Sequence, residues 1–574
     1  MNIFELYQKK IIALISKNSR LLKLNKFNDF KGVTVEIPPL DFNYDLSCNI
    51  CLILGKTNKV DPKQLALKFK ELLKNDIKDF NEIVVAGPGF LNIRLSNESL
   101  INNINEIISL KKTYGKKESN NSYNIEFVSA NPTGPMHIGH CRGAIYGDVL
   151  ANLLKFNGNQ VTKEYYTNDY GTQIVNFVKS VFLRIREIKY KEKFITSDNL
   201  YPGEYIIDIA KKIIDNKKLE TFDNFQKSYE LLKVESLKGS MELIKTDLKK
   251  LGIKHDIFFS ETDLVNNRLV EKAVDQLKKN NFVQEGYLEP PRGTVDKNWK
   301  KTKRLIFKST QFGDDTDRAL QKNDGSWTYF ANDVAYHMDK VKRNYQYLIN
   351  VLGADHTGYT KRLTAAVTAL SKNKVKLNCK VCQLVKLYKN GKPFKMSKRS
   401  GDFVSAKDLL KEVNKDSIRF MMLNRSNDVE LDFDFDKVLE KSKENPVFYV
   451  QYSFARISSL FRSINKKLED DIKLDTKEIN LNEQELKILR KVFEWPKVIE
   501  TASLKYEPHR IPFYLYELAT LFHAYWSKGN EDSNFKFVHE GNIKRKEALA
   551  VISVVAIVTQ IGMKILGVTL PERM

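Results

Sequence analysis

One segment, NPTGPMHIGH at residues 131–140, limits the possible folds of this chain more than any other. The preceding YNIEFVSA (123–130) is short, apolar and β-branched, which is typical of a buried strand. After the segment, apolar residues recur at helical spacing: Ile145, Val149, Leu153 and Phe156. Two prolines and Gly134 require a turn between the two elements. The sequence therefore predicts a strand, a tight turn and a helix that begins near His137.

The start of such a helix is a natural binding site for phosphate, because its first backbone N–H groups are unpaired and its dipole is positive there. His137 and His140 are three residues apart on one face of the first turn, and Gly139 leaves room for a flat base. Two imidazole donors at this place suit the charge that develops when a triphosphate is attacked at its α-phosphorus. Alone, this string is weak evidence, because histidines with a structural role are common.

A second segment, GKPFKMSKRSG at 391–401, is a basic loop bounded by glycine and proline. Its cations are Lys395, Lys398 and Arg399. In a lysine-rich chain a solvated surface loop is the alternative interpretation. A loop of this kind could also neutralise the phosphates of a bound nucleotide.

The chain has 574 residues, enough for roughly three or four domains with sizeable cores. Its net charge is +23, from 94 basic and 71 acidic side chains, which favours a polyanionic partner such as nucleic acid. Much of the excess is lysine in a chain rich in Asn and Ile, as an AT-rich genome would produce. Charge therefore only supports an argument made from motifs.

The N-terminal MNIFELYQKK lacks an apolar core of signal-peptide length, so nothing indicates secretion. The apolar run at 548–558 is too short to span a bilayer and predicts a buried helix. Two C-x-x-C pairs, Cys48/Cys51 and Cys379/Cys382, would have to meet to form a four-thiolate zinc site. Packing as small apolar residues, with free thiols in a reducing cytosol, fits them better, and we expect no structural zinc.

The chain order predicts three domains. Residues 1–115 form a small α+β domain that includes the strand-like segments VTVEI and CLILG. Residues 116–440 alternate strands (RLIFKST, SWTYFA, YLINVLG) with helices, one of them from Asp333. This α/β alternation predicts a doubly wound parallel sheet with its ligand at the carboxyl ends of the strands. Within it, residues 190–300 are charged and helical, without strands, and are interpreted as an insertion. Residues 441–574 form an all-α bundle.

Together the HIGH and KMSKR segments resemble the paired motifs of class I aminoacyl-tRNA synthetases. Further segments resemble the arginyl-tRNA synthetase family: NDYGTQI (168–174), WTYFANDVAYHMDK (327–340), GADHTGY (353–359), NPVFYVQYSFAR (445–456) and LPERM (570–574). The resemblance covers nearly the whole chain. Many family members lack the full lysine motif, whereas KMSKR is intact here.

The resemblance implies an ATP-dependent arginine–tRNA ligase that forms arginyl-adenylate and then charges the 3′-terminal adenosine of tRNA-Arg. It implies a Rossmann-type catalytic domain, an N-terminal domain that contacts tRNA and a helical anticodon-binding domain. Mg²⁺ would accompany ATP, held largely by phosphates and water. The family is often monomeric, and we expect a cytoplasmic monomer. Adenylate formation would require bound tRNA.

The resemblance also assigns roles to residues. The catalytic groups would be His137, His140, Lys395 and Lys398. ATP would contact Pro135, Gly139, both histidines, Gly353, Asp355, His356, Met396, Ser397 and Lys398. Arginine would contact Glu126, Asn131, His137, Tyr329, Asp333, His356 and, as a weaker candidate, Gln173. A planar guanidinium suits carboxylates, because its donors form a fixed fork.

Ordinary roles remain open for several of these residues. Asp333 could be a helix-start acid, and Glu126 a solvated residue of an edge strand. The Asp355–His356 segment could cap a helix. On the helical domain, Tyr452 and Arg456 are the best candidates for an exposed pair that stacks on unpaired tRNA bases, although single aromatics are usually core.

Three other functions compete with this interpretation. Cysteinyl-tRNA synthetase shares both motifs but should carry zinc ligands, and Cys141 has no obvious partners. Nucleotidylyltransferases share the HxGH helix start but are much shorter and lack a helical C-terminal domain. A catalytically dead RNA-binding paralogue would not be expected to keep both motifs. Arginine-dependent and tRNA-dependent AMP release from ATP would separate these options.

Overall fold

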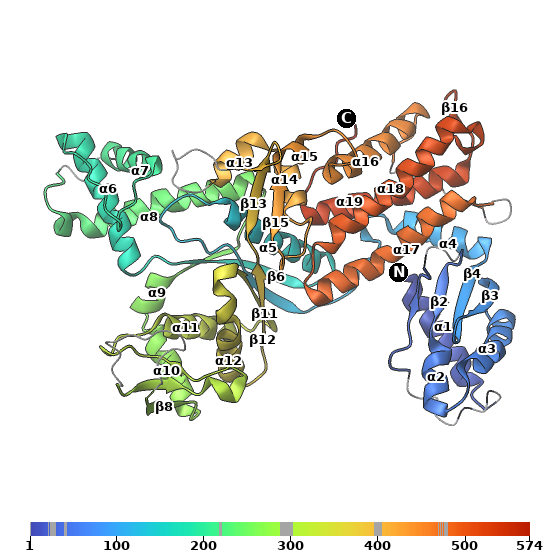
Figure 1. The fold of residues 1–574 in the computed structure, drawn as a ribbon, viewed down its shortest axis with the longest axis horizontal. Helices are drawn as coiled ribbons and strands as arrows, with labels where there is room; N and C mark the ends of the chain where they lie inside the picture. The colour runs from blue at the N-terminus through green and yellow to red at the C-terminus, as the bar shows by residue number, and fades with distance from the viewer. Residues whose placement is uncertain are drawn as a thin grey trace. The chain divides into compact units, whose positions relative to one another are not determined.

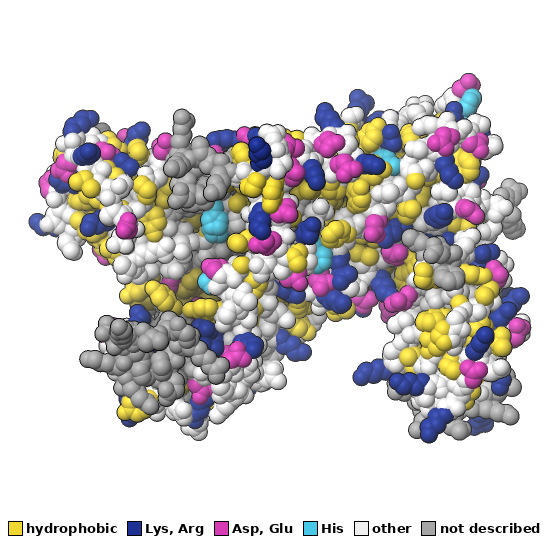
Figure 2. Space-filling view, in the orientation of Figure 1, with side chains coloured by type: hydrophobic (Ala, Val, Ile, Leu, Met, Phe, Trp, Pro, Cys, Tyr) yellow, Lys and Arg dark blue, Asp and Glu magenta, His cyan; other side chains and the backbone are white. Residues whose placement is uncertain are grey.

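The computed structural model (Figure 1) describes residues 2–20, 22, 24, 30–39, 43–216, 221–287, 302–394, 404–468, 470, 472, 474–475 and 480–574. The chain divides into two compact units. One comprises Glu118–Glu440, and the other comprises Met1–Lys117 with Lys441–Met574. On the face drawn in Figure 2, basic and acidic side chains are interspersed over the described residues.

The unit Glu118–Glu440 is built on a parallel sheet. Its strands are β5 (Ser122–Glu126), β6 (Gln160–Thr167), β7 (Ile257–Ser260), β11 (Tyr347–Gly353) and β12 (Lys376–Cys382). In the described part of the chain these five strands pair in the order β12-β11-β5-β6-β7. The chain runs outward from β5 in one direction and then returns to β11 on the other side. The predicted doubly wound sheet is therefore confirmed, and its order reverses between β5 and β11, where such sheets bind ligands.

Helices connect these strands. They are α5 (Ile138–Phe156), α6 (Thr172–Tyr190), α7 (Glu204–Asp215), α8 (Phe225–Lys250), α9 (Glu261–Asn266), α10 (Leu269–Lys279), α11 (Tyr329–Lys342), η3 (Ala354–Tyr359) and α12 (Thr360–Ser371). Figure 1 shows α6, α7 and α8 as one group, and their apolar faces share a core that includes Phe177, Ile209 and Leu232. The stretch 190–300, interpreted as a helical insertion without the strand rhythm, contains two strands: β7, which pairs with β6, and β8 (Val283–Gly286).

Two smaller sheets complete this unit. One pairs β8 (Val283–Gly286), β9 (Arg304–Phe307) and β10 (Arg318–Ala319); the other pairs β13 (Val385–Lys389), β14 (Lys392–Pro393) and β15 (Leu431–Asp434). The remaining short helices are η2 (Ser309–Phe312), α13 (Ala406–Glu412), α14 (Lys415–Met421) and α15 (Phe435–Leu439). The β13–β14 hairpin contains the first residues of the basic loop and leads into its KMSKR segment. SWTYFA is not a strand: the Thr328 hydroxyl accepts from Ala331 N at 3.2 Å and begins α11 at Tyr329.

The other unit begins with an α+β segment. Its elements are α1 (Ile3–Lys17), β1 (Val35–Glu36), β2 (Leu46–Cys48), α2 (Ile50–Asn58), α3 (Pro62–Asp76), β3 (Phe80–Ala86), β4 (Phe90–Leu95), α4 (Asn97–Leu110) and η1 (Lys111–Thr113). The strands form an antiparallel sheet in the order β1-β2-β4-β3. CLILG, predicted as a strand, lies in α2. Cys48 and Cys51 are completely buried, which confirms that they pack as small apolar residues.

The C-terminal part of this unit is helical, as predicted. Its elements are α16 (Pro446–Ser463), α17 (Glu483–Lys505), α18 (Arg510–Glu531), η4 (Ser533–Phe535), β16 (Val538–His539), β17 (Asn542–Ile543) and α19 (Lys546–Leu566). Among the described residues, α19 alone is long and apolar enough to cross a membrane, and 83% of its most apolar window is buried. The predicted buried helix is confirmed. The buried Trp495 of α17 donates to the Tyr114 carbonyl at 3.2 Å, which ties α17 to the N-terminal segment.

Candidate active site

The HIGH segment forms the predicted turn and helix start. His137 is the N-cap of α5: its Nδ1 accepts from Gly139 N at 3.1 Å, and His140 Nδ1 accepts from His137 N at 3.2 Å. The two rings stack with centroids 3.6 Å apart. A Cβ at Gly139 would lie 3.0 Å from the His137 ring, so glycine is needed to keep this stack. The helix start thus holds both imidazoles side by side.

These hydrogen bonds determine the chemical state of the histidines. Because each Nδ1 accepts a backbone N–H, each neutral ring carries its proton on Nε2. Burial lowers the pKa of His140 to about 3 and also lowers the pKa of His137, although the Asp355 carboxylate opposes the latter shift. At neutral pH both rings are therefore uncharged donors through Nε2–H.

The backbone between β5 and this turn is strained. Val128 and Ser129 have φ values of 73° and 43°, in the left-handed region that β-branched residues rarely adopt. The Ser129 hydroxyl donates to Glu126 Oε1 at 3.2 Å and accepts from Tyr166 N at 3.0 Å. These bonds hold the bend that carries the chain from the sheet to the histidines.

The chain directly after the basic loop is hydrogen-bonded to the HIGH segment. Ile138 N donates to the Val404 carbonyl at 3.0 Å, and Ala406 N donates to the Met136 carbonyl at 2.8 Å. Lys395, Met396, Ser397 and Lys398 lie outside the described residues. Lys398 precedes Val404 by six positions in the sequence, and a fully extended chain of that length spans about 20 Å. The segment that follows the basic loop therefore lies beside the helix start.

Acidic side chains gather at the carboxyl edge of the sheet. Glu126 ends β5, Glu261 follows β7, and Asp333 lies in the second turn of α11. Burial, together with the charges of Glu126 and Glu261, raises the pKa of Asp333 to about 8. Glu126 is 9% exposed and Glu261 is 5% exposed. The group attracts a cation, because several carboxylates share one partly buried space.

Glu126 is not a solvated edge residue. It lies on the central strand β5, and its Oε2 accepts from the buried Lys340 Nζ at 2.5 Å. Lys340 also donates to Asn350 Oδ1 at 3.2 Å. Lys340 was not predicted as a partner of Glu126. Glu261 was not predicted as a site residue, because the strand that precedes it, β7, was not recognised.

Glu261 is held by amides from two other elements. Asn332 Nδ2 donates to its Oε1 at 2.9 Å, and the Asn168 amide, oriented to satisfy both partners, donates to its Oε2 at 2.6 Å. Burial and the nearby Asp169 carboxylate raise the pKa of Glu261. Both carboxylate oxygens already accept hydrogen bonds, so Glu261 influences Glu126 and Asp333 through its negative charge.

Tyr329 shares a helix face with Asp333, because the two are four residues apart in α11. It lies in the first turn of this helix, not at the end of a strand as predicted, and it is 72% exposed. Its ring is therefore accessible to a ligand at the same face as Asp333.

Across the reversal point, β11 ends at Gly353 and is followed by Asp355 and His356 in η3. The effect of the Asp355 charge on His137 places η3 beside the helix start. His356 Nε2 lies 3.4 Å from Asp355 Oδ2, and both side chains are largely exposed. Among the other predicted contacts, Asn131 and Gln173 are exposed and Pro135 is half-buried.

In the other unit, Tyr452 and Arg456 stack on each other, with the guanidinium carbon 4.2 Å from the ring centroid. Arg456 Nη1 also donates to His523 Nδ1 at 3.1 Å. Both residues are half-buried, so the prediction of an exposed pair is wrong in this respect. Their stacked arrangement comes from packing against α18.

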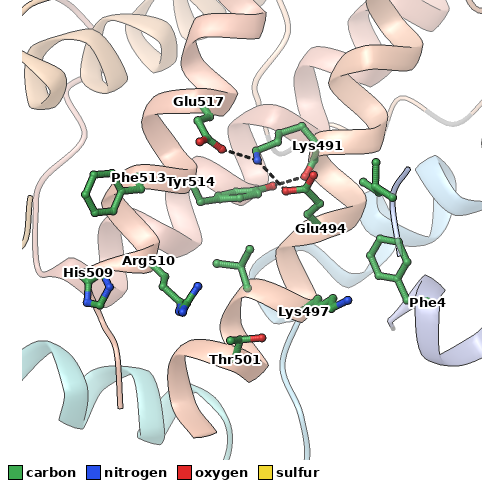
Figure 3. Close-up of a pocket in the computed structure, with 12 residues that line it drawn as sticks. Phe4, Lys491, Glu494, Lys497, Thr501, His509, Arg510, Phe513, Tyr514 and Glu517 are labelled. Atoms are coloured by element: carbon green, nitrogen blue, oxygen red, sulfur yellow. Dashed lines mark hydrogen bonds and ion pairs between the residues drawn. The ribbon is translucent and has the colours of Figure 1, made fainter. Parts of the chain in front are cut away.

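A cavity of about 500 Å³ lies in this unit, away from these residues (Figure 3). Lys491 lies between Glu494 at 2.7 Å and Glu517 at 2.5 Å. Near its rim Arg510 pairs with Glu507 at 2.6 Å. The charges of this cavity are thus matched within the protein, and it contains none of the predicted site residues.

Three protein families match successive parts of the chain. They are the arginyl tRNA synthetase N terminal domain (residues 7–95), the catalytic domain of class I tRNA synthetases (R) (residues 103–461) and the DALR anticodon binding domain (residues 450–574). The arginine–tRNA ligase of Pelagibacter ubique (strain HTCC1062) is 53% identical over the full length of both chains, and that of Ruegeria pomeroyi (strain ATCC 700808 / DSM 15171 / DSS-3) is 43% identical over both. The structure of Thermus thermophilus arginyl-tRNA synthetase has the same fold, with a TM-score of 0.73 over 99% of this chain and all of that one at 19% identity. The chain therefore belongs to the arginyl-tRNA synthetase family of class I tRNA synthetases.

Proposed function

We propose that this chain joins arginine to tRNA-Arg with ATP as the energy source. The observation that carries the proposal is the acidic group of Glu126, Glu261 and Asp333, which lies at the same sheet edge as the histidine-capped helix. A cation-binding site and a phosphate-binding helix start are thus adjacent. Arginine offers a cation at one end and a carboxylate nucleophile at the other, so it fits both.

The guanidinium of arginine binds Asp333, whose carboxylate is surrounded by negative charge. Glu126, already fixed by Lys340, adds a second carboxylate, and Tyr329 adds a hydrogen bond. A fork of five N–H donors matches this planar, acidic surrounding better than an ammonium does. Four residues bind the other end of the amino acid: Asn131, His137, His356 and, more weakly, Gln173.

ATP binds with its phosphates at the start of α5. The Nε2–H groups of His137 and His140 donate to phosphate oxygens, and the helix dipole adds positive potential. The pyrophosphate end meets Lys395 and Lys398 of the basic loop. The remaining contacts to ATP come from Pro135, Gly139, Gly353, Asp355, His356, Met396 and Ser397. Mg²⁺ accompanies ATP, held mainly by phosphate oxygens and water.

The reaction has two steps. An arginine carboxylate oxygen attacks the α-phosphorus, the bond to the bridging oxygen breaks, and pyrophosphate leaves with the electron pair. A terminal ribose hydroxyl of tRNA then attacks the adenylate carbonyl, loses its proton, and AMP leaves. The protein supplies positioning and charge stabilisation in both steps, and no covalent bond to the enzyme forms.

The helical C-terminal part holds the tRNA partner, with Tyr452 and Arg456 as candidate contacts to unpaired bases. The N-terminal domain, predicted as residues 1–115, makes a second contact to tRNA. The enzyme acts as a cytoplasmic monomer.

The test is aminoacylation of total tRNA with each of the twenty amino acids and ATP. We expect arginine alone to be incorporated, and incorporation of another amino acid would overturn the proposal. The variant Asp333→Ala should lower kcat/KM for arginine by orders of magnitude with KM for ATP nearly unchanged. The variant Asp339→Ala, on the same helix, is the matched control. Normal arginine kinetics in Asp333→Ala would show that Asp333 does not bind arginine.

A further inference from the structure

The helices between β6 and β7 contact the turn that carries the histidines. From α7, Tyr205 donates its hydroxyl to the Thr133 carbonyl at 2.9 Å. A Cβ at Gly134 would lie 2.9 Å from that hydroxyl oxygen and 3.1 Å from the ring carbon that bears it. The glycine of the turn is therefore needed for Tyr205 to reach the backbone. No part of the sequence near the motif indicates this contact.

A second contact comes from α8. The carboxylate of Asp247, which is 4% exposed, faces the backbone N–H of Met136, and this N–H favours the ionised form of the carboxylate and lowers its pKa. The carbonyl of Met136 accepts from Ala406 N, in the segment that follows the basic loop, at 2.8 Å. The peptide groups of this one residue, directly before His137, thus face Asp247 of α8 on one side and bond to the segment after the basic loop on the other.

The surroundings of Asp247 come from its own helix and from two others. Lys250 lies on α8, Lys407 and Asp408 come from α13, and Cys141 of α5 lies nearby. Burial raises the pKa of Asp247 to about 6, against the attraction of both lysines. At pH 7 the group is ionised and attracts the N–H of Met136, whereas below pH 6 it takes up a proton and this attraction weakens.

We propose that Tyr205 and Asp247 are positioning residues, through which α7 and α8 fix the turn so that His137 and His140 face the reacting phosphates. This inference rests on the proposed function and assigns a role to the helical stretch that interrupts the sheet. The Tyr205 hydrogen bond at Thr133 and the charge of Asp247 at the N–H of Met136 constrain the turn on both sides of Pro135. A shift of about 1 Å in a positioned group can cost about 100-fold in rate.

The experiment uses the full chain with the variants Tyr205→Phe and Asp247→Asn, which keep the size of each side chain. Tyr229→Phe in α8 and Asp208→Asn in α7 are the matched controls, since neither touches the turn. Arginine- and tRNA-dependent AMP formation is measured from pH 5.5 to 8.5, with the melting temperature of each variant. We expect kcat to fall about 10- to 100-fold in both variants, with KM for arginine within twofold of the wild type.

The wild type should lose kcat below about pH 6, and Asp247→Asn should lack this acid limb. Values of kcat in both variants equal to the controls, or an unchanged acid limb in Asp247→Asn, would overturn the proposal. If Asp247→Asn does not fold, Tyr205→Phe decides alone, because its single lost hydroxyl removes only the Thr133 bond. If the wild type charges another amino acid instead of arginine, the proposed function fails, while the same kcat comparison with that amino acid still decides this inference.

Discussion

Arginine binding should depend steeply on pH, because Asp333 takes up a proton when its site is empty. The pKa of its carboxyl is about 8 in the free protein, raised by burial and by the charges of Glu126 and Glu261. A bound guanidinium requires the ionised form and lowers this pKa. Since the folded free protein must lose the proton before it binds arginine, affinity should be full above pH 8 and fall as the pH drops below that value.

The size of the effect follows from the fraction of Asp333 that is ionised. Half is ionised at pH 8 and about one part in a hundred at pH 6, so the Kd for arginine should rise about 50-fold between these values. At pH 7 about 0.9 proton should be released for each arginine bound. The same change corresponds to about 2.3 kcal/mol of binding free energy.

Titration calorimetry of arginine into the protein at pH 6, 7 and 8 measures both quantities. Each titration is repeated in two buffers with different ionisation enthalpies, and the difference in heat counts the protons released. The variant Asp333→Asn should bind weakly, with no dependence on pH over this range. A wild-type Kd that changes less than twofold, without a buffer-dependent heat, would refute the reasoning.

Three further results are expected. The variant His140→Ala should lower the rate of tRNA-dependent pyrophosphate exchange about 100- to 1,000-fold, because one charge-stabilising donor is lost, while His539→Ala on β16 should match the wild type. Lys340→Met should lower the unfolding free energy of its unit by about 3–5 kcal/mol in urea, because Glu126 is left as a buried, unpaired charge; an effect no larger than that of the exposed Lys342→Met would contradict this. Pyrophosphate exchange with arginine and ATP alone should be near background until tRNA is added, and robust exchange without tRNA would contradict the expected tRNA requirement.

The long, strongly patterned elements of the fold could be predicted from sequence, and the short ones could not. YLINVLG forms β11 over its whole length, and the apolar run 548–558 lies inside the buried helix α19. The prediction of a strand at CLILG was wrong because a short apolar run fits a strand or a buried helix equally well. The strand β7 was not predicted because it has only four residues and follows the long helix α8. The start of α11 carried a signal that was missed, since Thr328 is a good N-cap residue.

In the site, features that depend on neighbouring residues could be predicted, and features that depend on distant residues could not. The histidine pair is local, so the spacing in HIGH was enough to predict its helix start. The environment of Glu126 is not local, because Lys340 is 214 residues further along the chain and meets it only when β5 and α11 pack together. For that reason a buried ion pair on a central strand was indistinguishable from a solvated edge residue in the sequence.

The balance of charge in the acidic group explains why it suits arginine. Three carboxylates, of Glu126, Glu261 and Asp333, are balanced by two cations, the Arg362 guanidinium and the buried Lys340 ammonium. In the free protein the excess of negative charge is reduced because Asp333 holds a proton. A ligand that displaces this proton must supply a positive charge of its own. A guanidinium does this at any physiological pH, since it is always protonated and donates in a plane to two carboxylates. A neutral analogue of the same shape gains no ion pair and leaves the proton on Asp333 at pH 7, so citrulline should bind far more weakly than arginine at pH 7 to 8, and its binding at pH 7 should release no proton.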